Sequence, residues 1–247
     1  MDAHTPDTTF LPPCDGAAVF LDFDGTLVDL APTPDAIHIP DALPGLLHAL
    51  SDRTVGALAL VSGRAVVDLA NWLPDYTGLI VGGHGAEWRR DGTLRARVDL
   101  SQDHLDVLSD AARAFAGTHP ALLLEEKPTG LVLHYRAQPN LHDKVTQFTD
   151  HLSQTHDQFE AHPAKMAVEM RPRGVGKDLA LADLMDMPAF AGRVPVMIGD
   201  DTTDEPALAW VQARGGVAIK VGQGDTVANH RLPDPDAVRA TLHHWQC

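Results

Sequence analysis

Residues 17–27 read Ala-Ala-Val-Phe-Leu-Asp-Phe-Asp-Gly-Thr-Leu, an apolar run that leads directly into two carboxylates two positions apart. An apolar run of this length predicts a buried strand, so the carboxylates would lie at its carboxyl end. There Asp22 could attack phosphorus and form an aspartyl-phosphate, and Asp24 could give and take the proton. The alternative is an Asp-rich turn in which Gly25 supplies a positive φ.

Two further apolar runs end in polar groups. Residues 56–64 read Gly-Ala-Leu-Ala-Leu-Val-Ser-Gly-Arg, and residues 194–205 read Val-Pro-Val-Met-Ile-Gly-Asp-Asp-Thr-Thr-Asp-Glu. Between them, Lys177 opens a helical pattern and could neutralise a phosphate. Singly, these features also fit a serine N-cap, a charged helix start and a surface lysine. Open parallel sheets bind ligands beyond the carboxyl ends of their strands, so the segments together predict one site.

The order of elements predicts an interrupted core with an insert. Strand-like and helical segments alternate in residues 1–100 and again in residues 173–247, which predicts an α/β fold with a Rossmann-like parallel sheet. Residues 101–172 instead predict helix, two strands, helix and two strands, with a hairpin at residues 128–130. This αββαββ insert is an α+β domain whose antiparallel sheet keeps one open face.

The motif order Asp-x-Asp-Gly-Thr, Ser, Lys, Gly-Asp-Asp-x-x-Asp resembles the haloacid dehalogenase superfamily of phosphohydrolases. Other pieces are similar to its trehalose-6-phosphate phosphatase family, over residues 19–235. These pieces are Leu30-Ala-Pro-Thr-Pro34, His84-Gly-Ala-Glu87, Leu124-Glu-Glu-Lys127, Leu133-His-Tyr-Arg136 and Val168-Glu-Met-Arg-Pro172. Gly83 and Met170 depart from the family's usual pattern, which bears on substrate preference more than on phosphoryl chemistry.

The resemblance implies a phosphatase that hydrolyses trehalose 6-phosphate through an aspartyl-phosphate on Asp22. Ser62 and Lys177 would hold the phosphoryl group, and the insert would be a cap domain that determines substrate specificity. The substrate-contacting residues expected in the core are Asp22, Phe23, Asp24, Ser62, Gly63 and Arg64.

The same resemblance implies Mg²⁺ as cofactor. We expect the ion to be held by Asp22, the backbone carbonyl of Asp24 and Asp200, with Asp201 and Asp204 as outer partners. Two carboxylates facing a phosphate repel it, and a divalent cation offsets that repulsion.

Alternation along the predicted insert strands places Glu125 and Lys127 on one face, and Glu169 and Arg171 likewise. These positions match substrate-contacting residues of the family, which favours contact with sugar hydroxyls. The alternative is a set of exposed charges that form ion pairs between strands.

Three rival functions stay open. The chain could act on another sugar phosphate, such as sucrose 6-phosphate or mannosyl-3-phosphoglycerate. It could be a phosphomutase that keeps the phosphoryl group, or a non-catalytic module that binds sugar phosphates and regulates a synthase. The non-catalytic module is disfavoured, because the chain keeps all the expected catalytic and metal-binding groups: Asp22, Asp24, Lys177 and Asp200.

The composition of the chain disfavours some classes of binding partner and indicates a cellular compartment. Lys and Arg number 19 against 34 Asp and Glu, a net charge of −15 that disfavours nucleic acid and anionic membranes. Cys14 and Cys247 lie near opposite ends, so we expect reduced thiols in a cytoplasmic protein. A functional link to trehalose-6-phosphate synthase is a further expectation from the family.

Overall fold

The computed structural model describes residues 6–31, 33, 36–98 and 100–245. The chain forms two compact units, a larger one from Met1–Arg95 with Gly176–Cys247 and a smaller one from Ala96–Val175. The sequence placed these boundaries at 100 and 173, where the structure has 95 and 176. Each unit is described by itself below.

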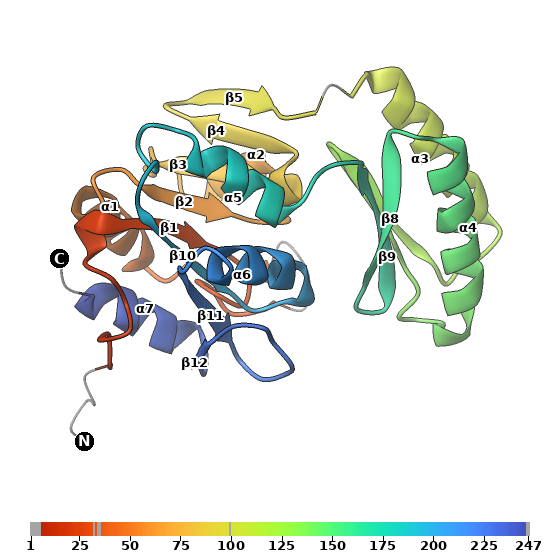
Figure 1. Ribbon diagram of the computed structural model, residues 1–247. Helices are drawn as coiled ribbons and strands as arrows, with labels where there is room; N and C mark the ends of the chain where they lie inside the picture. Colours follow the sequence, from red (N-terminus) through yellow and green to blue (C-terminus); the bar gives the residue numbers. More distant parts are fainter. Residues whose placement is uncertain (1–5, 32, 34–35, 99, 246–247) are drawn as a thin grey trace. The chain divides into compact units, whose positions relative to one another are not determined.

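The larger unit is built on one twisted sheet of eight strands (Figure 1). Strands β1 to β3 and β10 to β12 run parallel, and β4 runs antiparallel to β3. The parallel core predicted from the sequence is therefore confirmed. In spatial order the strands are β12 (His230–Leu232), β11 (Val217–Val221), β10 (Val194–Gly199), β1 (Ala17–Leu21), β2 (Leu58–Val61), β3 (Leu79–Gly82), β4 (Glu87–Arg90) and β5 (Thr93–Ala96).

Helices cover both faces of this sheet. One face packs against α1 (Leu43–Arg53), α2 (Val66–Trp72) and α7 (Pro235–His244), and the other against α5 (Lys177–Met185) and α6 (Glu205–Gln212). Because β1 is central and covered on both sides, all five of its residues are buried, which explains its unbroken apolar sequence.

The β4–β5 hairpin was not predicted. Its strands carry several arginines and exposed side chains and lack clean apolar alternation. The one usable signal is Asp91-Gly92 at the turn, where both residues have positive φ. The hairpin extends the parallel sheet with an antiparallel edge.

The N-terminal segment lies against the end of α7. Arg53 donates to the carbonyls of Trp245 and Leu242 at 2.6 and 2.8 Å, and the Trp245 indole donates to the Pro12 carbonyl at 2.6 Å. Nearby, Cys14 is disulfide-bonded, so the expectation of a reduced thiol there is wrong. The chain's other cysteine, Cys247, lies outside the described residues.

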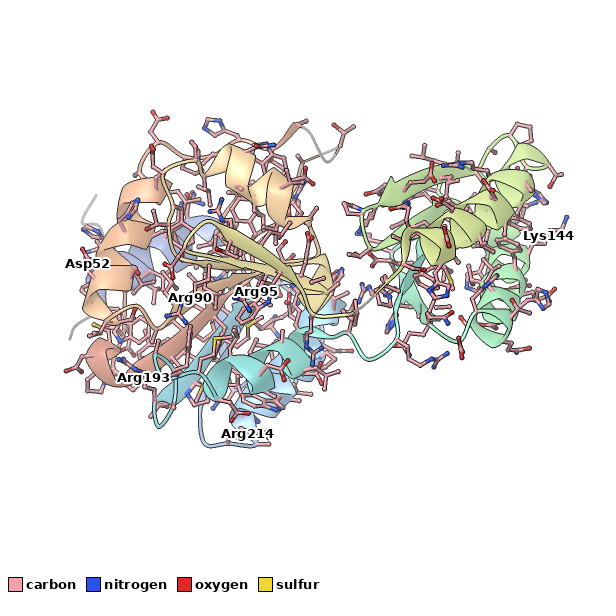
Figure 2. All side chains as sticks on the ribbon, turned by 90° about the horizontal axis from the view of Figure 1, so that it is seen from above. Asp52, Arg90, Arg95, Lys144, Arg193 and Arg214 are labelled. Atoms are coloured by element: carbon pink, nitrogen blue, oxygen red, sulfur yellow. The ribbon has the colours of Figure 1, made fainter. Side chains whose placement is uncertain are left out.

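The smaller unit has the order predicted for the insert. Two helices pack on one face of a four-stranded antiparallel sheet of order β6-β7-β9-β8. Lys144 on α4 is exposed to solvent (Figure 2). The elements are α3 (Gln102–Gly117), β6 (Leu123–Lys127), β7 (Gly130–His134), α4 (His142–Thr155), β8 (Phe159–Ala164) and β9 (Ala167–Pro172).

None of the helices in the described ranges combines the length and the apolar character that crossing a membrane requires.

Candidate active site

Asp22 follows β1 directly and is buried, with 4% of its surface exposed. Its Oδ1 accepts a hydrogen bond from Lys177 Nζ at 2.6 Å, and its Oδ2 accepts one from the Thr26 hydroxyl at 3.1 Å. Lys177 Nζ also donates to Asp204 Oδ1 at 2.6 Å. Lys177 begins α5, so residues 155 positions apart in the chain meet at the carboxyl edge of the sheet.

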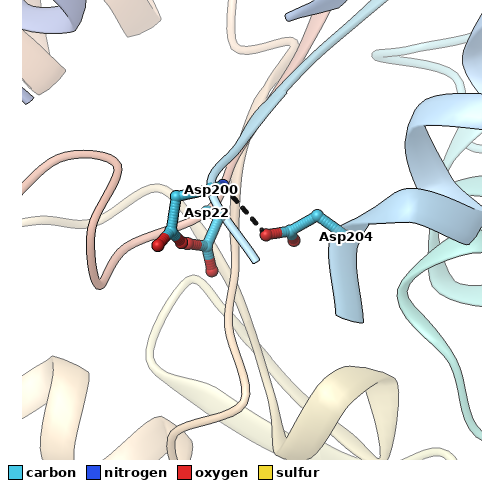
Figure 3. A group of neighbouring side chains, drawn as sticks. All are labelled: Asp22, Asp200 and Asp204. Carbon is cyan, nitrogen blue, oxygen red and sulfur yellow. Dashed lines mark hydrogen bonds between the residues drawn. The ribbon is translucent and has the colours of Figure 1, made fainter. Parts of the chain in front are cut away.

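Asp204 orders the acidic loop that follows β10. Its Oδ2 accepts hydrogen bonds from the backbone N–H groups of Asp200 and Asp201, at 3.1 and 3.0 Å. The bond from Asp200 is the dashed line in Figure 3. The Asp201 side chain accepts from the Thr202 N–H at 2.7 Å, which caps the short helix Thr202–Asp204. Both oxygens of Asp204 are therefore engaged within the protein, and Asp200 keeps its carboxylate for the site.

Burial and mutual repulsion make this cluster electrostatically costly. Burial, followed by the charge of Asp204, raises the pKa of Asp22 well above its ordinary value, although Lys177 opposes the change. Burial and the charges of Asp204 and Asp201 raise the pKa of Asp200 to about 6. Burial alone would lower the pKa of Lys177, but Asp204 and Asp22 raise it, so the lysine stays charged. The cluster is stabilised by additional positive charge.

The residues present fit a divalent cation. Oxygens of Asp22, Asp200 and Asp204 all lie within 4.8 Å of one another. Three carboxylates share the single ammonium of Lys177, so the cluster carries an excess of acidic groups that a divalent ion would offset. Gly25 has φ +74°, and a Cβ there would lie 2.1 Å from Asp200 Oδ2, so glycine lets the Asp200 carboxylate approach. Oxygen ligands of this kind suit Mg²⁺.

Asp24 is held by an arginine. Arg64 donates from Nε to Asp24 Oδ2 and from Nη2 to Asp24 Oδ1, both at 2.6 Å. The Arg64 backbone N–H donates to the buried Ser62 hydroxyl at 3.1 Å. The Ser-Gly-Arg segment after β2 thus lies beside the loop after β1, which brings Ser62 and Arg64 to the predicted site.

The His-Gly-Ala-Glu segment, residues 84–87, forms hydrogen bonds with the loop that joins β2 to α2. The backbone N–H of His84 donates to the Ser62 carbonyl at 2.9 Å, and a Glu87 carboxylate oxygen accepts from the Val66 N–H at 2.6 Å at the start of α2. A Cβ on Gly63 would lie 2.3 Å from His84 Nε2, so glycine permits this close packing. The segment that carried family resemblance therefore has a structural role here.

Three residues of this region were missed from the sequence. Thr26 bonds Asp22, and Trp72 packs against Arg64. Lys220 is buried in β11, and its Nζ donates to the Asp200 carbonyl. A charge inside the apolar run Val-Ala-Ile-Lys-Val was a usable signal for Lys220, because buried lysines are rare unless partnered.

The other predicted contacts lie on the smaller unit. Lys127 Nζ donates to Glu169 Oε1 at 2.7 Å, and Arg171 Nε donates to Glu169 Oε2 at 2.7 Å. His134 Nε2 lies 2.8 Å from Glu125 Oε2, and this hydrogen bond lowers the pKa of Glu125. Lys127 and Glu169 therefore pair between strands, as the alternative expected, but Glu169 and Arg171 are buried and pair within β9.

Comparison with known proteins shows which proteins this chain is similar to. The family model described as trehalose-phosphatase matches residues 20–235. A trehalose-6-phosphate phosphatase of Escherichia coli (strain K12) is 36% identical over 215 residues, which is 87% of this chain and 81% of that relative.

Two solved structures share the fold. The trehalose-6-phosphate phosphatase C-terminal domain of C. albicans has a TM-score of 0.77 at 22% identity, covering 92% of this chain and 91% of its own. A haloacid dehalogenase-like hydrolase from Bacteroides thetaiotaomicron has a TM-score of 0.66 at 17% identity, covering 91% and 97%. The family-model match over most of the chain, and the 36% identity to a relative of which the chain covers 81%, show that this chain belongs to the trehalose-phosphatase family.

Proposed function

We propose that this chain hydrolyses trehalose 6-phosphate to trehalose and inorganic phosphate through an aspartyl-phosphate intermediate. The observation that carries the proposal is the buried Asp22 carboxylate, held at 2.6 Å by Lys177 and followed two residues later by a second carboxylate. Family membership supports a phosphatase, and the name of the E. coli relative supports the sugar.

In the first step an Asp22 oxygen bonds to phosphorus while the bond from phosphorus to the sugar oxygen breaks. Asp24, protonated, gives its proton to the departing sugar oxygen. In the second step water gives a proton to the Asp24 carboxylate and its oxygen bonds to phosphorus. The bond from phosphorus to Asp22 then breaks, which releases phosphate and restores both residues.

Lys177 and Ser62 would hold the phosphoryl oxygens during both steps. Lys177 already lies at the carboxylate that attacks, so its charge can serve the phosphoryl group without rearrangement. The loops that follow β1 and β2 also carry Phe23, Gly63 and Arg64. We propose that these three residues line the substrate-binding site.

Mg²⁺ is the proposed cofactor. Asp22, Asp200 and the Asp24 carbonyl would hold it, with Asp204 as an outer partner that fixes the Asp200 loop. When bound, the ion would neutralise charge on the phosphoryl oxygens and on the carboxylates. Asp201, proposed from the sequence as another outer partner, is supported less, because its side chain caps the helix at Thr202.

The deciding assay is phosphate release from a panel of sugar phosphates. We expect hydrolysis of trehalose 6-phosphate to exceed that of sucrose 6-phosphate and mannosyl-3-phosphoglycerate in kcat/KM, to stop in EDTA and to return with Mg²⁺. A preference for another sugar would reject the substrate and leave the chemistry intact. Full activity after dialysis against EDTA would reject the metal. Sugar isomer formation without free phosphate would indicate a phosphomutase, and inactivity on every ester a binding module.

We propose that the open face of the smaller unit recognises the sugar. Glu169 is buried, with 6% exposed, and bonds both Lys127 and Arg171, so three of the four candidate side chains form one charged network. Such a network offers both donors and acceptors for sugar hydroxyls.

Glu169→Ala tests this assignment. We expect kcat/KM for trehalose 6-phosphate to fall by roughly 2 to 4 kcal/mol of transition-state stabilisation, and that for p-nitrophenyl phosphate to change little. The matched control is Glu126→Ala on the same sheet, because Glu126 pairs with Arg113 of α3 at 2.7 Å instead. An equal loss on both substrates, or no loss on either, would reject a role in sugar recognition.

We propose a cytoplasmic protein that acts on a small molecule, with neither nucleic acid nor membrane as partner. The net charge of −15 supports the last two statements. The disulfide at Cys14 weighs against the reduced thiols on which the cytoplasmic assignment partly rested. A link to trehalose-6-phosphate synthase follows from the substrate, since a sugar-joining enzyme must supply a phosphorylated disaccharide. Cell fractionation tests the compartment, and co-purification tests the link.

A further inference from the structure

The turn that follows β3, at residues 83–85, has an unusual backbone. Gly83, His84 and Gly85 all have positive φ, of 54°, 55° and 107°. This region favours glycine, so a histidine held in it, with only 7% of its surface exposed, is under local strain. Strained backbone gathers at functional sites, where the surrounding structure holds it in place. We therefore expect this turn to do more than reverse the chain.

One side of the turn holds Ser62. The His84 N–H donates to the Ser62 carbonyl at 2.9 Å, and the Gly83 N–H donates to the Arg64 carbonyl at 2.8 Å. The Ser62 N–H donates to the Val81 carbonyl of β3 at 2.9 Å. Both backbone groups of this buried serine are therefore bonded to β3 and to the turn that ends it.

The other side of the turn lies against the start of α5. A Cβ on Gly85 would lie 2.9 Å from the Gly176 carbonyl oxygen and 3.1 Å from the Ala180 Cβ. Carbon atoms pack best at about 3.5 to 4.0 Å, so a side chain here would push the turn and the helix apart. Gly176 directly precedes Lys177, which donates to Asp22 at 2.6 Å. Glycine at position 85 therefore lets the turn contact the helix start that carries this lysine.

We propose that the turn at residues 83–85 is a positioning element for phosphoryl binding, because it fixes the separation between Ser62 and Lys177. The serine follows β2 and the lysine opens α5, and the turn contacts both segments. Displacing a group that holds a substrate by about 1 Å can cost about 100-fold in rate. The proposal rests on the proposed function in one respect, that Ser62 and Lys177 hold the phosphoryl oxygens. It does not depend on which sugar carries the phosphate.

Gly85→Ala tests the proposal. The added methyl group should displace the start of α5 from the turn, while both phosphoryl-binding side chains stay in the chain. With Mg²⁺ present, we expect inorganic phosphate to bind about tenfold more weakly in isothermal titration calorimetry, and kcat/KM for p-nitrophenyl phosphate to fall at least about tenfold. Calorimetry with inorganic phosphate measures binding directly, without turnover.

Gly92→Ala is the matched control. Gly92 has φ +73° in the β4–β5 hairpin, and within the described part of the chain a Cβ there would meet no atom within 4 Å. Both substitutions place an alanine at positive φ, but only the one at Gly85 presses on another element. We expect Gly92→Ala to lower the melting temperature slightly and to keep phosphate affinity within about twofold of wild type. A lower melting temperature for Gly85→Ala with unchanged phosphate affinity would overturn the proposal and leave the turn as a packing feature.

A second pair of variants separates the backbone from the imidazole, and it also serves if Gly85→Ala does not fold. His84→Asn and His84→Thr both remove the ring, but asparagine adopts positive φ more readily than the β-branched threonine. We expect His84→Asn to bind inorganic phosphate about fivefold more tightly than His84→Thr. Equal affinities for the two variants would overturn the proposal.

A double variant tests the route of action. Once Ser62→Ala has removed the hydroxyl, its separation from Lys177 no longer matters, so adding Gly85→Ala should weaken phosphate binding by less than a further twofold or so. Losses that multiply would overturn the proposal. A wild-type protein that binds no phosphate would contradict the proposed roles of Ser62 and Lys177, and the positioning role with them. Hydrolysis of p-nitrophenyl phosphate without hydrolysis of trehalose 6-phosphate would contradict the proposed sugar alone.

Discussion

Asp22→Asn is expected to lower kcat on trehalose 6-phosphate by roughly 10,000-fold, because the amide oxygen is a poor nucleophile toward phosphorus. The fold should survive, since the asparagine carbonyl oxygen still accepts from Lys177 and its amide nitrogen can donate to the Thr26 hydroxyl oxygen. Stability should be equal or higher, because the substitution removes one of three mutually repelling carboxylates, two of which are buried. Phosphate release and thermal denaturation measure the two effects separately.

The matched control for Asp22→Asn is Asp52→Asn, the same chemical change at an exposed site on α1 (Figure 2). It should leave both turnover and melting temperature unchanged. If Asp22→Asn retained more than about a tenth of wild-type turnover, in a preparation free of wild-type enzyme, an aspartyl-phosphate on Asp22 would be ruled out. Asp22→Ala guards against slow deamidation of the asparagine.

Lys177→Met should damage activity and stability together, in contrast to Asp22→Asn. The ammonium lies 2.6 Å from both Asp22 and Asp204, and all three groups are buried. Removing one partner of a buried ion pair leaves an uncompensated charge, at a cost of about 3 to 5 kcal/mol in the free energy of unfolding. Loss of a cation beside the phosphoryl group should lower kcat/KM by about 100- to 1000-fold as well.

Urea denaturation of the larger unit and steady-state kinetics measure these losses. Lys144→Met on α4 is the control, because its exposed ammonium can be removed at a cost below about 0.5 kcal/mol. Adding Asp204→Asn to Lys177→Met should return part of the stability, since it removes an unpaired anion. A Lys177→Met protein as stable as wild type would contradict the structural role of this lysine.

The central strands could be predicted from the sequence because burial on both faces imposes an apolar run on each of them. Runs such as 17–21 and 194–198 are apolar throughout, since central parallel strands are covered on both faces, and each ends where a polar loop begins. The β4–β5 hairpin was not readable, because an edge strand tolerates charge and keeps no apolar pattern. Cys14 was misjudged because its sequence neighbours give no hint that the segment around Pro12 bonds Trp245, more than 200 positions away.

What the chain alone determined was the chemistry available at the strand ends: two carboxylates after β1, a serine after β2, a lysine opening α5 and an acidic loop after β10. Because the strands run parallel, their carboxyl ends lie at the same edge of the sheet, independently of how the side chains pair. The pairings were decided only by the tertiary structure, because Arg64 with Asp24, Lys177 with Asp204 and Trp72 with Phe23 join positions with no local pattern between them. Packing and long-range charge select such partners, and neither leaves a periodic signature in the sequence.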